Sequence, residues 1–334
     1  MLPFKLVYSD GYSLPIGPHV FPAEKYRLVR ERLLATGVAV AEDFLTPEPA
    51  REEDVLRVHE AGYVRKLLTG TLTPQEELQL EIPYSPELVK AFWLHAGGSI
   101  LAAQRALADG VSVNLGGGFH HAFPDHGEGF CMINDVAIAI RRMQADKKIE
   151  RAMVVDCDVH QGNGTAAIFN RRTRPAPLPS TGPAMLGRAT QAEPAAPDVF
   201  TISLHQEHNY PAWKPPSSID VHLPDGIGDA QYLAWLDNAL SSALRQFQPD
   251  LLCYVAGADP YCEDQLGGLA LSLEGLKRRD ELVFRVARTR GIPVMVTFAG
   301  GYAVNLLDTV TIHANTVIAA SEVLASTAAS ARTS

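Results

Sequence analysis

The chain has 334 residues, of which 46% are hydrophobic, and a formal net charge of −9. This composition is typical of a globular protein with a large core, and the scattered basic residues argue against the basic stripe that direct nucleic-acid binding requires. The N-terminus resembles no secretory signal, and no apolar run approaches the roughly 20 residues that cross a bilayer. We therefore expect a cytoplasmic protein that binds neither nucleic acid nor a membrane.

Six short apolar segments are predicted strands, and they span residues 5–9, 111–115, 151–158, 198–205, 251–259 and 292–301. Most are continuously apolar, which is typical of parallel strands that are covered on both faces. Amphipathic stretches between them predict helices within residues 22–34, 85–107, 134–145, 229–245 and 272–290. Asp229 is the expected N-cap of the fourth helix, whereas the fifth begins at a serine and ends at Gly291. This alternation predicts one α/β domain, with a mainly parallel central sheet flanked by helices on both faces.

Two segments interrupt this pattern. Residues 171–197 are rich in proline and alanine, and they are too long for an ordinary connection. We expect a surface loop, which is either a tolerated insertion or a gate for a partner or substrate. Residues 326–334 are expected to form a flexible tail after a catalytic domain over residues 1–325.

The four cysteines form no C-x-x-C pair, and two of them lie in or beside apolar strand-like segments. Buried, reduced thiols are therefore a better interpretation than a disulfide framework, which agrees with a cytoplasmic protein. The four are Cys131, Cys157, Cys253 and Cys262.

Reactive side chains follow one predicted strand after another. Ligands of open α/β sheets bind beyond the carboxyl ends of the strands, so this repetition predicts a site at that edge. The side chains concerned are the pair in "GGGFHHAF" (His120 and His121), those in "DCDVHQGNG" (residues 156–164), His205, Asp259 and Tyr302.

Asp156, Asp158 and His160 are spaced by two, so on an extended chain they point the same way. Asp158 and His160 could then reach one metal ion, and their oxygen and nitrogen donors suit zinc, iron or manganese. A catalytic metal usually has three protein ligands, and Asp259 directly after an apolar strand is the best third candidate. Alone, such a D-x-H pattern more often forms caps or ion pairs; the neighbouring histidines favour the metal.

Asp156 and Asn163 are placed to orient the two adjacent imidazoles. A carboxylate stabilises a charged imidazolium, whereas an amide only fixes the ring, so one histidine would be charged and the other neutral. The spacing leaves open which ring meets which partner.

Tyr302 follows two glycines, and its phenol is either an oxyanion donor or a packing residue. Phe130 also follows a glycine and either walls an apolar slot or belongs to the core.

These residues resemble the zinc-dependent histone deacetylase family within the arginase–deacetylase fold, in its class IV and bacterial branch. The motifs are "GGGFHHAF", "GEGFCMIND", "VVDCDVHQGNGTAAIF", "AGAD", "DQLGGLALS" and "DELVFRVARTRGIPVMVTFAGGY", with "HNYP" and "RDELVF" indicating the branch. The resemblance implies a set of catalytic roles. Zinc, or iron in its place, would bind Asp158, His160 and Asp259; His121 would be the base, His120 its charged partner, Asp156 and Asn163 their orienting residues, and Tyr302 the oxyanion donor.

The resemblance also implies a substrate tunnel and a second ion. Phe130, Tyr210 and Leu266 would line the tunnel, and the backbone carbonyl of Gly129 would meet the substrate amide. A structural potassium ion would bind Asp156, Asp158 and Ser203 with the backbone oxygens of His160 and Leu204. The chain departs from some relatives in having asparagine at 163, which allows a shifted pH profile, and in the insertion at 171–197.

The function implied is hydrolysis of acetyl or longer acyl groups from lysine ε-amines in proteins or peptides, through metal-activated water. A first alternative with the same catalytic residues is deacetylation of small acylated amines such as acetylpolyamines. An arginase-like enzyme with two manganese ions would need further aspartates. A non-catalytic acyl-lysine binding protein would lack ligands or the tyrosine, and all of these are present.

Overall fold

The computed structural model describes residues 1–170 and 198–330, so the predicted insertion lies outside the described residues. Within them, eight strands form one sheet in the order β2-β1-β3-β8-β7-β4-β5-β6, with every neighbouring pair parallel. The parallel sheet predicted from the continuous apolar segments is confirmed. The strands are β1 (Lys5–Val7), β2 (Phe44–Leu45), β3 (Val111–Asn114), β4 (Ala152–Asp156), β5 (Val199–Gln206), β6 (Ile219–Leu223), β7 (Leu251–Val255) and β8 (Val294–Thr297).

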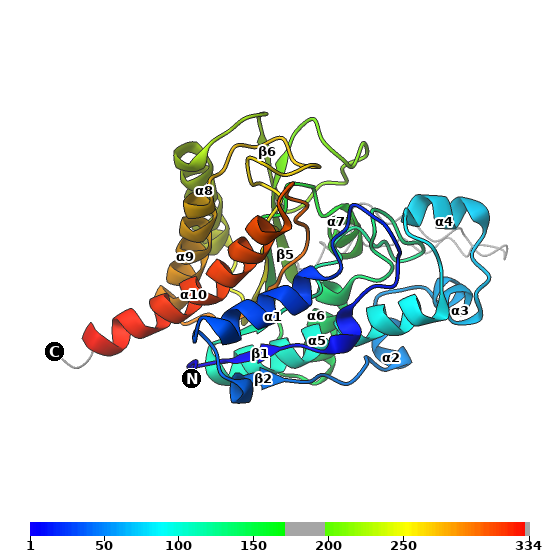
Figure 1. Cartoon of the computed structure of the whole chain (residues 1–334), viewed down its shortest axis with the longest axis horizontal. Helices are drawn as coiled ribbons and strands as arrows, with labels where there is room; N and C mark the ends of the chain where they lie inside the picture. The colour runs from blue at the N-terminus through cyan, green and yellow to red at the C-terminus, as the bar shows by residue number, and fades with distance from the viewer. Residues whose placement is uncertain (171–197, 331–334) are drawn as a thin grey trace, which may run out of the picture.

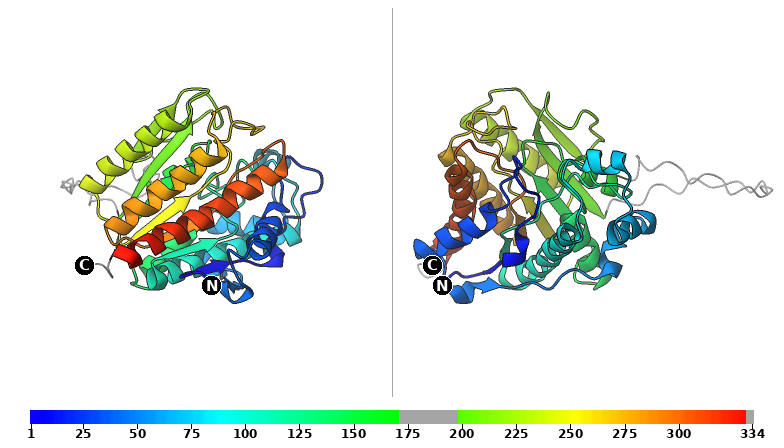
Figure 2. Two further views of the ribbon diagram at one scale, coloured as in Figure 1. Left: turned by 60° about the vertical axis from the view of Figure 1, so that its left-hand side comes forward. Right: turned by 45° about the vertical axis from the view of Figure 1, so that its right-hand side comes forward.

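Helices cover both faces of the sheet, as expected (Figure 1). One layer holds α1 (Lys25–Ala35), α8 (Asp229–Gln246), α9 (Leu273–Thr289) and α10 (Leu306–Ser330), of which the last three run side by side in Figure 2. The other layer holds α5 (Pro86–Asp109), α6 (Asp135–Ala145) and α7 (Asn163–Phe169). Short helices lie in the connections before α5, namely η1 (Asp10–Tyr12), η2 (Ala41–Asp43), α2 (Glu52–Val55), α3 (Ala61–Thr69) and α4 (Pro74–Leu80). No described helix is both long and apolar enough to span a bilayer.

Three details differ from the expectations. Helix α8 begins at Asp229 with Gly228 as its N-cap, because the Asp229 carboxylate instead accepts hydrogen bonds from Ser272 N (2.8 Å) and Oγ (2.6 Å) at the start of α9. Helix α10 continues to Ser330, so the first five residues of the expected tail are helical. Among the cysteines, all free, Cys262 is exposed and only the other three are buried.

A buried arginine is hydrogen-bonded to the segments that follow two strands at the carboxyl edge of the sheet. Arg279 on α9 donates through Nη1 to the carbonyls of Gly257 (2.6 Å) and Cys157 (3.2 Å), which follow β7 and β4. Its Nε donates to Asp280 Oδ1 (2.9 Å), which also accepts from the Tyr254 hydroxyl (2.5 Å). Because a buried charge is tolerated only when it is paired and hydrogen-bonded, this network fixes the two segments that follow the strands.

Replacing Arg279 by methionine is expected to lower the free energy of unfolding by about 3–5 kcal/mol, because the Asp280 carboxylate loses its buried partner. Urea unfolding followed by circular dichroism measures the change. Arg278→Met is the matched control, since Arg278 is the exposed neighbour on the same helix and should change stability by about 0.5 kcal/mol or less. Equal effects of the two substitutions would contradict the role given to Arg279.

Candidate active site

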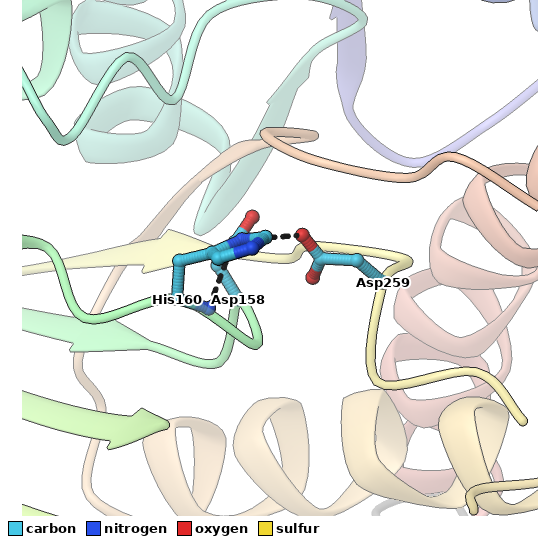
Figure 3. Close-up of side chains that lie close together, drawn as sticks. All are labelled: Asp158, His160 and Asp259. Atoms are coloured by element: carbon cyan, nitrogen blue, oxygen red, sulfur yellow. Dashed lines mark hydrogen bonds and ion pairs between the residues drawn. The ribbon is translucent and has the colours of Figure 1, made fainter. Parts of the chain in front are cut away.

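Three buried side chains converge at the carboxyl edge of the sheet (Figure 3). Asp158 and His160 follow β4, and Asp259 follows β7. His160 Nδ1 lies 3.1 Å from Asp158 Oδ1 and 3.2 Å from Asp259 Oδ2. Donor atoms of all three residues lie within 4.8 Å of one another, so the predicted ligand set is brought together in space.

The spacing of two is not what aligns these residues. Strand β4 ends at Asp156, so the alternation of an extended chain stops there. Beyond it the carboxylates shape the turn, because Asp156 Oδ1 accepts from Asp158 N (3.2 Å) and Asp158 Oδ1 accepts from His160 N (3.0 Å). The sequence therefore predicts residues that the fold brings together, but the geometric reason lies in these side chain–backbone bonds.

The donor group suits a divalent cation. Asp259 Oδ1 accepts from Val159 N (2.8 Å), but the buried Oδ2 accepts no hydrogen bond from the described residues. Burial, and then the neighbouring Asp158 carboxylate, raise the pKa of Asp259 to about 7. A cation between the two carboxylates would give this oxygen a ligand bond in place of the missing hydrogen bond, and a set of two carboxylates and one imidazole suits zinc or iron.

Gly300 allows the two carboxylates to meet. A Cβ atom at this position would lie 2.2 Å from Asp259 Oδ2 and 2.6 Å from Asp158 Oδ2. Its backbone N–H donates to Asp158 Oδ2 (2.8 Å). A larger residue would therefore displace the carboxylate oxygens of Asp158 and Asp259. We call Asp158, His160 and Asp259 the metal group.

The adjacent histidines have separate partners. His120 Nδ1 lies 2.7 Å from Asp156 Oδ2, and His121 Nδ1 lies 2.7 Å from Asn163 Oδ1. The two ring centroids are 4.1 Å apart. The structure thus answers the question that the spacing left open, with the carboxylate on His120 and the amide on His121.

The two imidazoles differ in charge. Burial opposes protonation of His120, but the carboxylates of Asp156 and Asp158 outweigh it and raise its pKa to about 9. Burial, together with the charges of His120 and His160, holds the pKa of His121 well below its usual range. Near neutral pH the pair therefore consists of one charged and one neutral ring, as the difference between carboxylate and amide predicts.

Two further buried histidines hold the ends of the 116–123 loop that carries this pair. Gly117 N–H donates to His95 Nδ1 (3.1 Å), and His95 Nε2 donates to Tyr12 O (3.0 Å). At the other end His59 Nδ1 donates to Phe123 O (2.9 Å). Since a carbonyl only accepts and an amide N–H only donates, His95 must be neutral with its proton on Nε2.

Because of these two histidines, we expect the free energy of unfolding to fall at acidic pH. Burial lowers the pKa of His95 to about 3 and that of His59 to about 4, whereas unfolded histidine titrates near 6.5. The unfolded state therefore binds more protons below about pH 6.5, and each histidine lowers the free energy of unfolding by about 1.4 kcal/mol per pH unit until its folded pKa is reached. Urea unfolding as a function of pH should show a shallower slope for His59→Gln than for the wild type. Equal slopes in wild type and His59→Gln would contradict this.

A narrow pocket leads to the metal group. Its lining includes Phe21, His121, Gly129, Phe130, His160 and Tyr302. The Phe130 and Tyr302 ring centroids are 6.1 Å apart, and the Tyr302 backbone N–H donates to Asp264 Oδ2 (2.7 Å). The predicted Tyr302 and Phe130 thus face the same space as the histidine pair.

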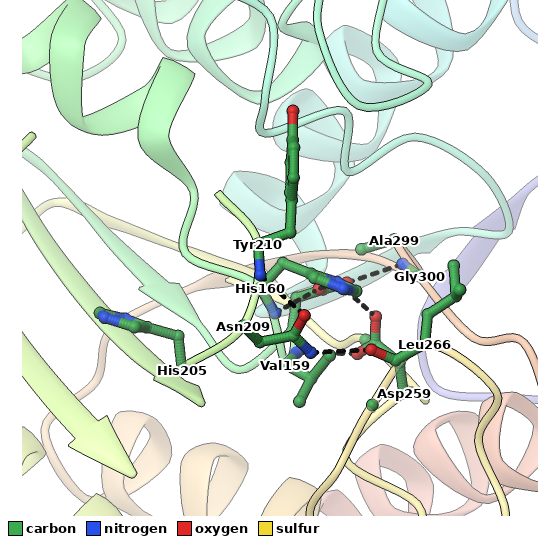
Figure 4. Close-up of polar contacts among 12 residues, drawn as sticks. Val159, His160, His205, Asn209, Tyr210, Asp259, Leu266, Ala299 and Gly300 are labelled. Atoms are coloured by element: carbon green, nitrogen blue, oxygen red, sulfur yellow. Dashed lines mark hydrogen bonds and ion pairs between the residues drawn. The ribbon is translucent and has the colours of Figure 1, made fainter. Parts of the chain in front are cut away.

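The remaining predicted substrate residues lie beside this pocket rather than in its lining. Tyr210 has its ring centroid 5.0 Å from that of His121, and Figure 4 shows it directed away from Asp259. Leu266 is joined to the loop after β5 because its carbonyl accepts from Asn209 Nδ2 (2.7 Å). Tyr210 therefore lies in the loop after β5, and Leu266 is hydrogen-bonded to that loop through Asn209.

His205 is not brought to the metal group, although it follows the pattern of polar residues at strand ends. It bonds Ser203 Oγ (2.9 Å) and His222 Nδ1 (3.0 Å) and lies apart from His160 in Figure 4. Ser203 itself pairs in register with Asp156, which places two of the residues expected at the potassium site on adjacent strands.

Several supporting residues could not be assigned from the sequence. His95 gives a signal outside the quoted motifs, because it is a polar residue inside the apolar stretch "AFWLHAGG". Asp135 lies in the motif "GEGFCMIND" and accepts from the backbone of the glycine loop at Phe119 N (2.8 Å). The residues missed are His59, His95, Glu128, Asp135, Asp264 and Arg279.

The parallel sheet and the Asp-His-Asp group at its carboxyl edge define an α/β protein with a group of side chains that could bind a metal ion. The family model of the histone deacetylase domain matches residues 19–318. An uncharacterized protein of Picosynechococcus is 40% identical over 311 residues, covering 93% of this chain and 96% of that protein. Histone deacetylase 2 of Arabidopsis thaliana is 30% identical over 310 residues, covering 89% and 74%.

A more distant relative, the histone deacetylase-like amidohydrolase of Pseudomonas aeruginosa, is 28% identical over 316 residues, covering 87% of this chain and 77% of that protein. The solved structure of an HDAC homolog complexed with SAHA matches the fold with a TM-score of 0.73 at 22% identity, covering 97% of this chain and 88% of that chain. The chain belongs to the histone deacetylase family. It is a hydrolase that acts as a deacetylase.

Proposed function

We propose that this deacetylase is a zinc-dependent amidohydrolase that removes acyl groups from lysine ε-amines of proteins or peptides. The observation that carries the proposal is the buried Asp158–His160–Asp259 group at the end of a narrow pocket, beside a charged and a neutral histidine. A zinc ion held there would polarise the acyl carbonyl and lower the pKa of water.

The protein groups would divide the proton transfers. His121 is neutral and has its Nδ1 engaged with Asn163, so Nε2 is free to take a proton from the attacking water. His120 would keep its charge against Asp156 and stabilise the negative charge that develops nearby. A protonated histidine would then donate to the leaving amine.

Tyr302 would bind the oxygen of the tetrahedral intermediate. Burial raises the pKa of its phenol well above the usual value, so the hydroxyl stays protonated and can donate. Phe21 and Phe130 narrow the pocket between them, with ring centroids 6.3 Å apart. Such a slot suits a thin alkyl stem, with the Gly129 carbonyl proposed to accept from the substrate amide and Tyr210 and Leu266 proposed at the outer wall.

A substrate panel tests this proposal. Purified protein loaded with zinc, or separately with iron, would be assayed on peptides that carry acetyl- to long-chain acyl-lysine and on acetylpolyamines. We expect hydrolysis of acyl-lysine peptides that a chelator abolishes and zinc restores. Turnover of acetylpolyamines alone would replace this substrate class with small acylated amines, and no turnover of either would overturn the proposal.

Two related proposals remain. A structural potassium ion would lie beside Asp156, Asp158 and Ser203, with the backbone oxygens of His160 and Leu204 as further ligands. A cytoplasmic location is proposed from the four free thiols, since a reducing compartment keeps cysteines in that state.

A further inference from the structure

A carboxylate lies directly behind the amide that orients His121. Glu128 Oε1 accepts from Asn163 Nδ2 (2.6 Å) and from the Tyr210 hydroxyl (2.8 Å). Its other oxygen accepts from Gln79 Nε2 (3.2 Å) and lies 3.6 Å from His126 Nε2, and the side chain is 17% exposed. The mechanism above gives this acidic residue no role.

The bonding chain fixes the position of a proton. An ionised carboxylate only accepts, so Asn163 must turn its NH2 group toward Glu128 and its oxygen toward His121. That oxygen only accepts, so His121 must carry its proton on Nδ1 and leave Nε2 free. Gly164 N–H also donates to the Asn163 oxygen (3.0 Å) and favours the same orientation, but the bond to Glu128 is shorter and charge-assisted.

The backbone holds Glu128 in this place. Glu128 N donates to Cys131 O (3.1 Å), and Cys131 N donates to Glu128 O (2.9 Å). Between them, Gly129 and Phe130 have φ angles of +53° and +66°, so the turn is tight. The same turn therefore presents two pocket residues and aims the carboxylate at Asn163.

We propose that Glu128 is a positioning residue that sets the orientation of Asn163 and, through it, the tautomer of His121. The proposal rests on the proposed function in one respect, since it takes His121 to be the base. It makes Glu128, Asn163 and His121 one unit, in which a carboxylate acts on the base through an amide.

The first test removes the acceptor. Glu128→Gln keeps an oxygen for Asn163 and Tyr210, so kcat/KM should stay within about threefold of wild type. Glu128→Met offers no acceptor, and kcat/KM should fall by about 10- to 100-fold, the range for groups that support a ligand or base from behind. Tyr210→Phe removes the hydrogen bond from the Tyr210 hydroxyl and leaves the one from Asn163 in place. Asp237→Asn is the control for loss of a carboxylate, because Asp237 is exposed on α8 and should leave kcat/KM unchanged within about twofold.

The second test exchanges the charges. Asn163→Asp would place two carboxylates 2.6 Å apart, so its kcat/KM should fall by about tenfold or more. Combining it with Glu128→Gln lets the new amide donate to the carboxylate introduced at position 163, and activity should recover at least in part. A purely structural Glu128 would give losses that add, whereas the proposal requires that the second substitution rescue the first.

The third test reads the proton directly. Nitrogen-15 NMR of the metal-free protein should show His121 as the Nδ1–H tautomer in wild type and in Tyr210→Phe, and a mixed or Nε2–H tautomer in Glu128→Met. Unchanged tautomer and activity in Glu128→Met, with wild type active and His121→Ala inactive, would overturn the inference and leave the proposed function standing. If wild type hydrolysed no acyl-lysine, the proposed function would fail, and the tautomer measurement would still decide the role of Glu128.

Discussion

Replacing Asp259 by asparagine should abolish zinc binding and lower kcat/KM by more than about 10³-fold. The substitution removes one of two carboxylates in the donor group, and losing a whole metal ion removes more charge stabilisation than losing one oxyanion donor. Metal analysis of the purified protein and the acyl-lysine assay measure the two effects.

Loss of folding would not explain this result. Burial and the Asp158 carboxylate raise the pKa of Asp259 to about 7. At about pH 8 the ionised Asp259 carboxylate is therefore destabilised in the metal-free protein by burial and by repulsion from Asp158. We expect metal-free Asp259→Asn to melt at or above the temperature of metal-free wild type, and zinc to stabilise only the wild type.

Asp264→Asn is the matched control for this substitution. Asp264 contacts the backbone of Tyr302 instead of the metal group, so its variant should keep the zinc while losing turnover. One zinc ion per chain in Asp259→Asn would contradict the assignment of Asp259 as a ligand.

Replacing His121 by alanine should lower kcat by about 10²- to 10⁴-fold, and Tyr302→Phe by about 10²- to 10³-fold. The first substitution removes the neutral imidazole that faces the pocket, and the second removes only the hydroxyl that would meet the oxyanion. Both variants should retain zinc, because neither residue belongs to the donor group.

Steady-state kinetics together with metal analysis separate the two effects. His222→Ala is the control for loss of an imidazole, since His222 is exposed on β6 and should leave kcat unchanged within about twofold. Unchanged rates in both His121→Ala and Tyr302→Phe would disprove the proposed mechanism.

The central strands could be predicted because burial on both faces requires continuous apolar segments, as in "RAMVV" of β4. The edge strands β2 and β6 were missed. The first has two residues, and the second is mostly half-exposed, so neither shows an apolar run. A continuous apolar segment marks a strand that is buried on both faces. Edge strands are partly exposed, so their sequences lack this signal.

The residues that meet at the carboxyl edge of the sheet could be predicted from their position at strand ends, but their contacts could not. His121 and Asn163 are 42 positions apart, and nothing in their spacing distinguishes Asn163 from Asp156 as the partner of His121. The role of Glu128 could not be predicted for the same reason, since an acidic residue between two glycines usually lies in a solvent-exposed turn. Only the folded loops reveal which side chain donates to which.

Arg279 has a consequence for a protein whose cysteines are all free. Its guanidinium joins α9 to the segments after β4 and β7, and the bond to Cys157 O spans 122 positions. It therefore acts as a non-covalent cross-link between distant parts of the chain. Unlike a disulfide, this link does not depend on the redox state of the compartment. A reducing environment therefore leaves the segments that carry Asp158, His160 and Asp259 joined to α9.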